Sequence, residues 1–177
     1  MNPLRLSFAA LLAALMMLPG HAAVAGPQLD DATILAIFDQ ANAIDIYTAR
    51  MGAKYGHSQA VRELGRAVAA DHEMVQQMGR DLARTLGIVP TPPAGDTSVA
   101  DQAKTVAMLS AQSGTGFDAA YLRHEIAYHQ AVIDALKNTL LPAISNPEFK
   151  ALVNKVLPGF EHHLAETKAV ARKLGVN

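Results

Sequence analysis

Apolar residues recur along most of this chain at the three- and four-residue spacing of amphipathic α-helices. The spacing predicts four long helices, over residues 30–55, 58–86, 114–140 and 146–174. A shorter amphipathic segment, residues 98–110, stands in the long connection between the second and third helices. No stretch shows the strict alternation of apolar and polar residues that is typical of a half-buried strand. The pattern therefore predicts an all-α protein.

The ends of the predicted helices carry residues that favour helix starts and stops. The second helix is followed by Gly87, a residue suited to the left-handed position after a helix, with Pro90 beyond it. Residues typical of helix starts precede the first, second and fourth helices: Asp30 or Asp31, Ser58, and Asn146 before Pro147. At the start of the third helix, the pair Thr115 and Asp118 resembles a capping box. These signals support the four boundaries.

The connection between the second and third helices, residues 87–116, is too long for a tight turn. It is long enough to return along the length of a helix, so the second and third helices can run parallel to each other. Four long helices with this connectivity predict a ferritin-like four-helix bundle, with a long crossover that contains a short extra helix.

Charged and polar residues interrupt the apolar stripe of every long helix. Glu125 and His129 stand where a bundle helix normally carries leucine, and Asp45, His72 and His163 interrupt the other three stripes. Each lies near the middle of its helix. If packed helices align their midpoints, all five side chains lie within about 5 Å of one level, at about 1.5 Å rise per residue. The sequence therefore predicts one polar layer across the core.

Buried charges in such a layer must be paired, hydrogen-bonded or coordinated. Imidazoles and carboxylates are ligands for zinc, copper and iron, so His72, His129, His163, Glu125 and Asp45 are candidate metal ligands. The alternative is a network of histidines and carboxylates that binds no metal and only fixes the register of the helices. The sequence leaves both open. His57, His124 and His162 are predicted to lie at the surface or at the rim of the layer.

Composition and the absence of certain motifs exclude several classes of function. The formal net charge is -1 with both signs interspersed, so no basic face for nucleic acid is expected. The chain has no cysteine, which excludes disulfides, thiolate ligands and a cysteine nucleophile. It also lacks a nucleophile elbow, a glycine-rich phosphate loop and a His-Glu-x-x-His zinc motif. The sequence therefore assigns no reaction or substrate.

The first 25 residues have the features of a secretory signal peptide. Arg5 precedes an apolar run over residues 6–18, and small residues at 23–25 predict cleavage after Ala25. The run is shorter than the roughly 20 residues of a membrane-spanning helix, and no later run reaches that length. We therefore expect a periplasmic or secreted protein, with residues 26–177 forming one helical domain that is not stably inserted in a membrane.

The chain resembles the DUF4142 domain proteins, a family of exported bacterial proteins with a ferritin-like four-helix fold and no settled biochemical role. The matching positions are residues 45–52, residues 68–72, Leu86-Gly87 with Pro90, Ser113-Gly114 with Phe117, Asp118 and Tyr121, His129, and Leu157-Pro158 with His163-Leu164. They span about residues 30–174, and the family usually has glutamate at the position of Asp45. The resemblance implies the same fold and export.

The likeness to ferritin-like di-iron proteins is more distant. Those proteins place a glutamate three residues before each metal-binding histidine of two helices. Here His72 has no such glutamate, and His163 precedes Glu166 instead of following it. A mononuclear zinc or copper site richer in histidine fits these residues at least as well. The competing hypothesis is a non-catalytic binding or stress-tolerance module of the cell envelope.

Overall fold

The computed structural model describes residues 29–176 of the chain, and every regular element in this range is helical. The elements are α2 (Asp31–Tyr55), α3 (Gln59–Leu86), α4 (Ser98–Ser110), α5 (Gly114–Ala135), a π-helical turn η2 (Leu136–Leu140), α6 (Leu141–Ala143) and α7 (Pro147–Lys173). The predicted all-α class is confirmed. The predicted signal peptide lies outside the described residues. Within residues 29–176, no helix is long and apolar enough to cross a membrane.

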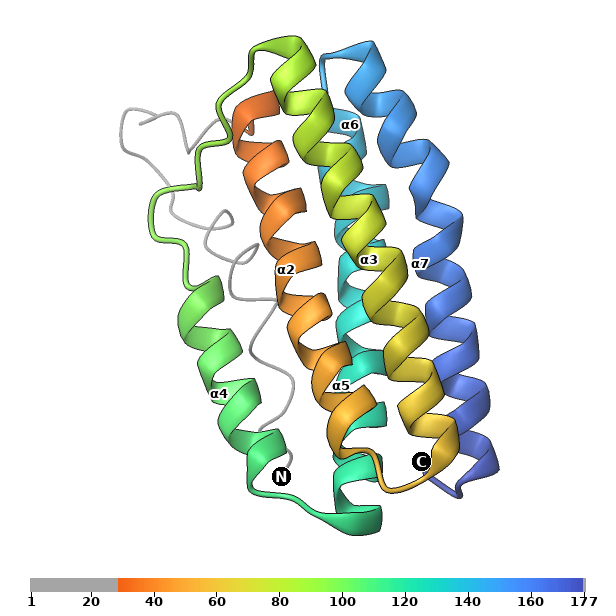
Figure 1. Cartoon of the computed structure of the whole chain (residues 1–177). Helices are drawn as coiled ribbons and strands as arrows, with labels where there is room; N and C mark the ends of the chain where they lie inside the picture. The colour runs from red at the N-terminus through yellow and green to blue at the C-terminus, as the bar shows by residue number, and fades with distance from the viewer. Residues whose placement is uncertain (1–28, 177) are drawn as a thin grey trace, which may run out of the picture.

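The four long helices, α2, α3, α5 and α7, lie side by side, and α4 packs outside them along α2 (Figure 1). Helix α3 runs antiparallel to α2. The connection that contains α4 then returns along the bundle, so α5 starts at the same end as α3 and runs parallel to it (Figure 1). Helix α7 runs back along α5. The short helix expected over residues 98–110 is therefore present, and the crossover has the expected geometry.

Three of the predicted helix starts are confirmed by side-chain caps. Asp30 accepts a hydrogen bond from the Thr33 backbone N–H at 2.8 Å. Ser58 caps α3 by accepting from the Val61 N–H. Asn146 caps α7 by accepting from the backbone N–H groups of residues 148 and 149. Gly87 ends α3 in the left-handed region, with φ 65°. Local sequence signals therefore set these boundaries.

The start of the third long helix differs from the prediction. Helix α5 begins at Gly114 after Ser113, and the predicted capping box is wrong. The Asp118 carboxylate instead accepts hydrogen bonds from the backbone N–H groups of His57 and Ser58, at 2.7 and 2.8 Å. It therefore ties α5 to the turn between α2 and α3. The end of this helix also differs, because the last turn before Leu141 is π-helical, whereas a plain α-helix to Leu140 was expected.

The core consists of two apolar clusters, one toward each end of the bundle. One cluster contains Phe38, Phe149 and Phe160, and the other contains Val68 and Phe117. Along each long helix the change from one cluster to the other falls at the candidate polar residues. The buried polar side chains are Asn42, Asp45, Thr48, His72, Asp118, Glu125, His129, His163 and Thr167. Most of them therefore form a layer between the two clusters.

Glycine allows α2 and α3 to approach closely on one side of this layer. A Cβ atom at Gly65 would lie 2.5 Å from the backbone oxygen of Ala49 and 2.5 Å from the nitrogen of Ala53. A Cβ atom at Gly52 would lie 2.4 Å from the ring of Tyr121. These two glycines set how near α3 and α5 come to α2, and hence how near the polar side chains of the three helices come to one another.

Candidate metal centre

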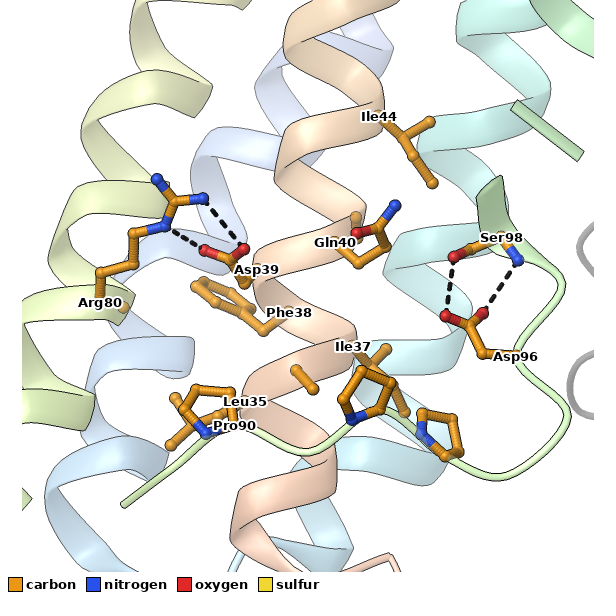
Figure 2. A pocket seen from close by; sticks show the side chains of 15 residues that line it. Leu35, Ile37, Phe38, Asp39, Gln40, Ile44, Arg80, Pro90, Asp96 and Ser98 are labelled. Carbon is orange, nitrogen blue, oxygen red and sulfur yellow. Dashed lines mark hydrogen bonds and ion pairs between the residues drawn. The ribbon is translucent and has the colours of Figure 1, made fainter. Parts of the chain in front are cut away.

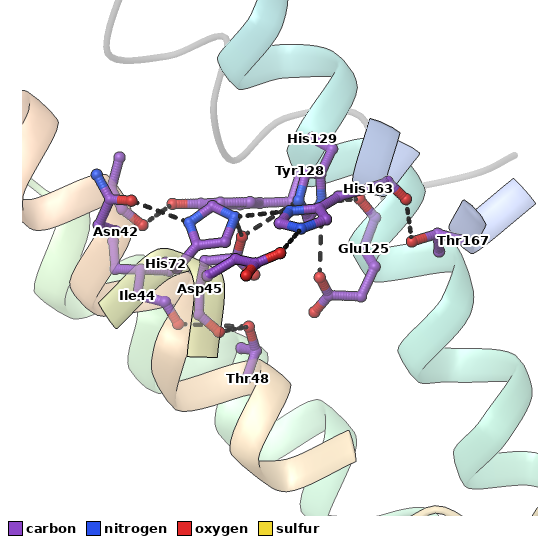
Figure 3. Close-up of polar contacts among 12 residues, drawn as sticks. Asn42, Ile44, Asp45, Thr48, His72, Glu125, Tyr128, His129, His163 and Thr167 are labelled. Carbon is purple, nitrogen blue, oxygen red and sulfur yellow. Dashed lines mark hydrogen bonds and ion pairs between the residues drawn. The ribbon is translucent and has the colours of Figure 1, made fainter. Parts of the chain in front are cut away.

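The five candidate residues lie together in the middle of the bundle (Figure 3). Helix α2 supplies Asp45, α3 supplies His72, α5 supplies Glu125 and His129, and α7 supplies His163. The first four are at most 2% exposed, and His163 is 4% exposed. The structure therefore brings all five predicted residues to one level, as the alignment of helix midpoints predicted.

Their donor atoms are closely spaced. Asp45 Oδ2 lies 3.0 Å from His72 Nε2 and 3.3 Å from His129 Nε2. His72 Nε2 lies 3.2 Å from His163 Nδ1. Two groups of three residues could each hold a metal ion, and they share His129: one is His72, His129 and His163, and the other is Asp45, Glu125 and His129. In each group the donor atoms all lie within 4.8 Å of one another.

A buried amide fixes the ring of His72. Asn42 Nδ2 donates to the backbone oxygen of Phe38 at 2.8 Å, so Asn42 Oδ1 is the atom that faces His72 Nδ1, at 3.0 Å. Because an amide oxygen only accepts, the proton of the neutral ring sits on Nδ1. The lone pair of Nε2 then points toward Asp45.

Acceptors behind the other two rings have the same effect. His129 Nδ1 lies 3.0 Å from the backbone oxygen of Glu125, which can only accept. His163 Nε2 lies 3.0 Å from Asp71 Oδ2, a carboxylate oxygen. In the neutral rings the protons therefore sit on these two atoms. The lone pairs of His129 Nε2 and His163 Nδ1 face the same space as that of His72 Nε2.

Several atoms that face this space have no hydrogen-bond partner within residues 29–176. They are both carboxylate oxygens of Asp45, both of Glu125, and His129 Nε2. Buried polar atoms are normally satisfied, because an unpaired one costs about 1–3 kcal/mol. A cluster of unpaired acceptors around one point is the arrangement that binds a cation.

The buried environment sets the charges of the layer. Burial alone would raise the pKa of the Asp45 carboxyl, but the positive charge that His72 and His129 carry when protonated outweighs this effect and holds its pKa below the ordinary value. Burial raises the pKa of Glu125 well above its ordinary value, and the Asp45 carboxylate raises it further. Burial lowers the pKa of both His129 and His163. The directions of these shifts favour an ionised Asp45, a protonated Glu125 and neutral His129 and His163.

Sequence reasoning missed the acceptors behind the rings. Asn42 stands three residues before Asp45 and is fully buried, so a search for any polar residue beside the α2 stripe would have found it. Thr48, three residues after Asp45 in the stripe itself, is also fully buried. Thr48 hydroxyl donates to the backbone oxygens of residues 44 and 45. Asp71 gives no such signal, because its side chain is 57% exposed and reaches His163 across the gap between α3 and α7.

The three remaining histidines of the described chain lie outside the cluster, as predicted. His57 is exposed. His162 is exposed and lies 3.3 Å from the Glu166 carboxylate. His124 is half-buried at the rim, with its ring centroid 5.7 Å from that of Tyr128. Burial lowers the pKa of His124 to about 4.

Fold and site together define a helical bundle protein with a buried layer of histidines and carboxylates. The model of the family described as a domain of unknown function (DUF4142) matches residues 16–170, and the chain belongs to this family. The predicted family is therefore confirmed.

The structure also resembles the crystal structure of a DUF305 fragment from Deinococcus radiodurans. The two chains share 18% sequence identity, with a TM-score of 0.69 over 84% of this chain and 96% of the other. At this identity the likeness concerns the all-helical fold alone. No curated protein matches the chain.

Proposed function

We propose that this protein binds one transition-metal ion between His72, His129, His163 and Asp45. The observation that supports the proposal is the direction of the three imidazole lone pairs. Each ring has an acceptor behind its other nitrogen. The lone pairs of His72 Nε2 and His129 Nε2 face Asp45 Oδ2 at 3.0 and 3.3 Å, and His163 Nδ1 lies 3.2 Å from His72 Nε2. Second acceptors of this kind are typical of metal-binding histidines, because they fix the tautomer and orient the ring.

The spacing of the donor atoms supports a four-ligand site. Ligand bonds of about 2.0–2.1 Å in a tetrahedron place neighbouring donor atoms about 3.3 Å apart. Three of the six distances among these four ligands match this value: Asp45 Oδ2 to His72 Nε2 at 3.0 Å, His72 Nε2 to His163 Nδ1 at 3.2 Å, and Asp45 Oδ2 to His129 Nε2 at 3.3 Å. Three nitrogens and one oxygen in this geometry suit zinc and also copper. The carboxylate-rich pattern of di-iron proteins fits the residues less well.

Glu125 has a different role in this proposal. Its Oε2 lies 3.6 Å from His129 Nδ1, on the protonated side of that ring. Its raised pKa favours the protonated form, whose hydroxyl can donate to the neighbouring Asp45 carboxylate. We therefore assign Glu125 to holding Asp45 in place and not to the metal itself.

The competing proposal is a layer without a metal. A protonated His72 would donate from Nε2 to Asp45 Oδ2, 3.0 Å away, and would form a buried ion pair with it. Such a network would fix the register of the four helices and carry no chemistry. The protein would then be a binding or stress-tolerance module of the cell envelope.

We also propose that residues 26–177 form one ferritin-like four-helix domain, exported to the periplasm or secreted after cleavage at Ala25. The parallel course of α3 and α5 supports the ferritin-like connectivity (Figure 1). The apolar run and the small residues at 23–25 support export. N-terminal sequencing of the mature protein tests the cleavage site.

Metal analysis of protein purified without a His tag tests the metal proposal. After exposure to Zn, Cu, Fe or Mn and removal of the excess, we expect one ion per chain. His163→Ala should lower the affinity by more than about 100-fold, because it removes a ligand. His162→Ala is the matched control and should bind as the wild type does. If no metal is retained in stoichiometric amount, the proposal is wrong.

Two isosteric changes separate the roles of the carboxylates. Asp45→Asn removes a charged ligand and should abolish retention of the metal, whereas Glu125→Gln should keep it. Equal loss in both variants would make Glu125 a ligand.

Thermal unfolding gives an independent measurement. Free metal at 100 times its Kd should stabilise the wild type by about 2.7 kcal/mol. The double variant His72→Ala, His129→Ala should show no such rise in melting temperature.

A further inference from the structure

The buried layer borders a hollow on the surface between α3 and α7. The hollow has a volume of ≈ 240 Å³, and His72 and His163 belong to its lining. Its other walls include Asp71, Met74 and Met78 of α3 and Gly159 of α7. Two members of the proposed metal centre therefore border a space that is continuous with solvent.

The members of the layer that do not line this hollow are fully buried. Asp45, Glu125 and His129 are 0% exposed. The larger hollow, of ≈ 300 Å³, lies between α2 and the connection that follows α3, and its lining contains none of the five candidate residues (Figure 2). It is lined by apolar α2 side chains and prolines, with the Asp39–Arg80 ion pair at one side. Of these two hollows, the smaller one is therefore the one that borders the metal centre.

Asp71 connects the smaller hollow to the centre. Its side chain is 57% exposed, and it is the one carboxylate among the lining residues of this hollow, which also include one cation, Lys155 of α7. The same carboxylate accepts from His163 Nε2 at 3.0 Å. A cation that enters the hollow therefore meets a negative charge that is already bonded to a ligand histidine.

We propose that the hollow between α3 and α7 is the port through which the metal ion enters and leaves, with Asp71 as the carboxylate that receives it. The inference rests on the proposed metal-binding function. A volume of ≈ 240 Å³ corresponds to roughly eight waters at about 30 Å³ each. The hollow therefore has room for a cation that still carries part of its hydration shell.

Gly159 offers a way to close the port without touching a ligand. It lies one helical turn before His163, and a Cβ atom there would meet nothing within 4 Å. Gly159→Leu should fill the hollow with an apolar side chain and leave the backbone of α7 in place. Gly116→Leu is the matched control, because Gly116 is exposed in α5 and its Cβ atom would lie 3.5 Å from the Gln112 side chain, an ordinary contact distance.

The experiment measures the rates at which Co²⁺ enters the metal-free full chain and is removed by a chelator. The visible absorption of Co²⁺ in a tetrahedral site reports occupancy directly. In Gly159→Leu, we expect both rates to fall by the same factor, about tenfold or more, because the end states are unchanged and the path is narrowed. The Kd of Co²⁺ should therefore equal that of the wild type. Gly116→Leu should exchange Co²⁺ at the wild-type rates.

A second variant widens the port and keeps the test independent of how well Gly159→Leu folds. Met74→Ala with Met78→Ala removes two side chains from the walls of the hollow, and both rates should rise. If Co²⁺ exchanges at wild-type rates in folded Gly159→Leu, or in the double alanine variant, the proposal that this hollow is the port is wrong. If the wild type shows no Co²⁺ absorption, the proposed metal-binding function is itself wrong.

Discussion

At the scale of single residues, the acceptor behind each imidazole determines what the ring can bind. The three rings use three kinds of acceptor: the amide of Asn42, a backbone carbonyl and the carboxylate of Asp71. A ring with a free choice of tautomer would present its lone pair to the centre only part of the time. The fixed tautomers make the site ready for a metal ion before the ion arrives.

Removal of the amide behind His72 should weaken the site without removing a ligand. Asn42→Ala leaves the His72 N–H unpaired in the core, so the free energy of unfolding of the metal-free protein should fall by about 1–3 kcal/mol. Metal affinity should fall about 10–100-fold. Titration calorimetry and urea unfolding measure the two effects.

Asn154→Ala is the matched control for this change. Asn154 makes the same bond to the backbone oxygen four residues earlier, at 2.9 Å, but it is exposed and has no histidine partner. It should change the free energy of unfolding by no more than about 0.5 kcal/mol. An equal loss of metal affinity in both variants would show that Asn42 does not orient His72.

At the scale of helices, carboxylates fasten the turns at the two ends of the bundle. Asp118 of α5 accepts from two backbone N–H groups in the turn between α2 and α3. Asp31 at the start of α2 accepts from the backbone N–H groups of Ser145 and Asn146, before α7. Each bond joins residues at least 60 positions apart in the chain. These contacts fix how far each helix is shifted along its neighbour, and so hold the polar side chains at one level.

The polar side chains can meet only if α2 and α3 also lie close together, and this close approach depends on Gly65. Gly65→Ala would place a methyl group 2.5 Å from backbone atoms of α2, which cannot yield as a side chain can. The two helices should move apart, with a loss of about 1–3 kcal/mol in the free energy of unfolding. A lower affinity for metal should accompany it, because Asp45 and His72 lie on these two helices.

Gly116→Ala tests whether the effect comes from packing. The same substitution in an exposed part of α5 should be neutral or stabilise the protein by up to about 1 kcal/mol, since alanine favours the helix. Thermal unfolding of the two variants gives the comparison. If Gly65→Ala is as stable as Gly116→Ala, the close approach of α2 and α3 does not limit the packing of the bundle.

At the scale of the whole molecule, the buried titratable groups make the metal-free protein sensitive to acid. The pKa values of His124, His129 and His163 are lowered by burial, so the unfolded chain takes up protons before the folded one does. Their contribution to stability is complete above about pH 6.5, the ordinary value for histidine. This stabilising contribution is lost as the pH falls below that value. For His124 the loss continues until the pH reaches its folded-state pKa of about 4.

Glu125 acts in the opposite direction, because its pKa is raised. Its contribution is complete below the ordinary carboxyl value and is lost as the pH rises. In Glu125→Gln, where this opposing contribution is removed, the free energy of unfolding should decrease on the acid side of about pH 6.5. Urea unfolding with a chelator present, between pH 4.5 and 7.5, measures this. His124→Phe should flatten the acid side; an unchanged slope would mean that His124 is not one of the groups responsible.

The sequence by itself determined the four long helices, three of their caps, the family, and the five polar residues of the layer. These depend on local spacing and on the chemistry of residues close together in the chain. Asp45, His72, Glu125, His129 and His163 stand out because each interrupts an apolar stripe, and helix length alone then places them at one level.

Tertiary structure decided what those residues face. The tautomer of His72 depends on Asn42 of another helix, and that of His163 depends on Asp71 of α3. The partner of Asp118 is a turn 60 residues away, which is why the predicted capping box was wrong. Such contacts depend on how each helix is rotated and shifted against its neighbours. Spacing within one helix carries no information about that rotation, so the convergence of lone pairs on one point appears only in the packed bundle.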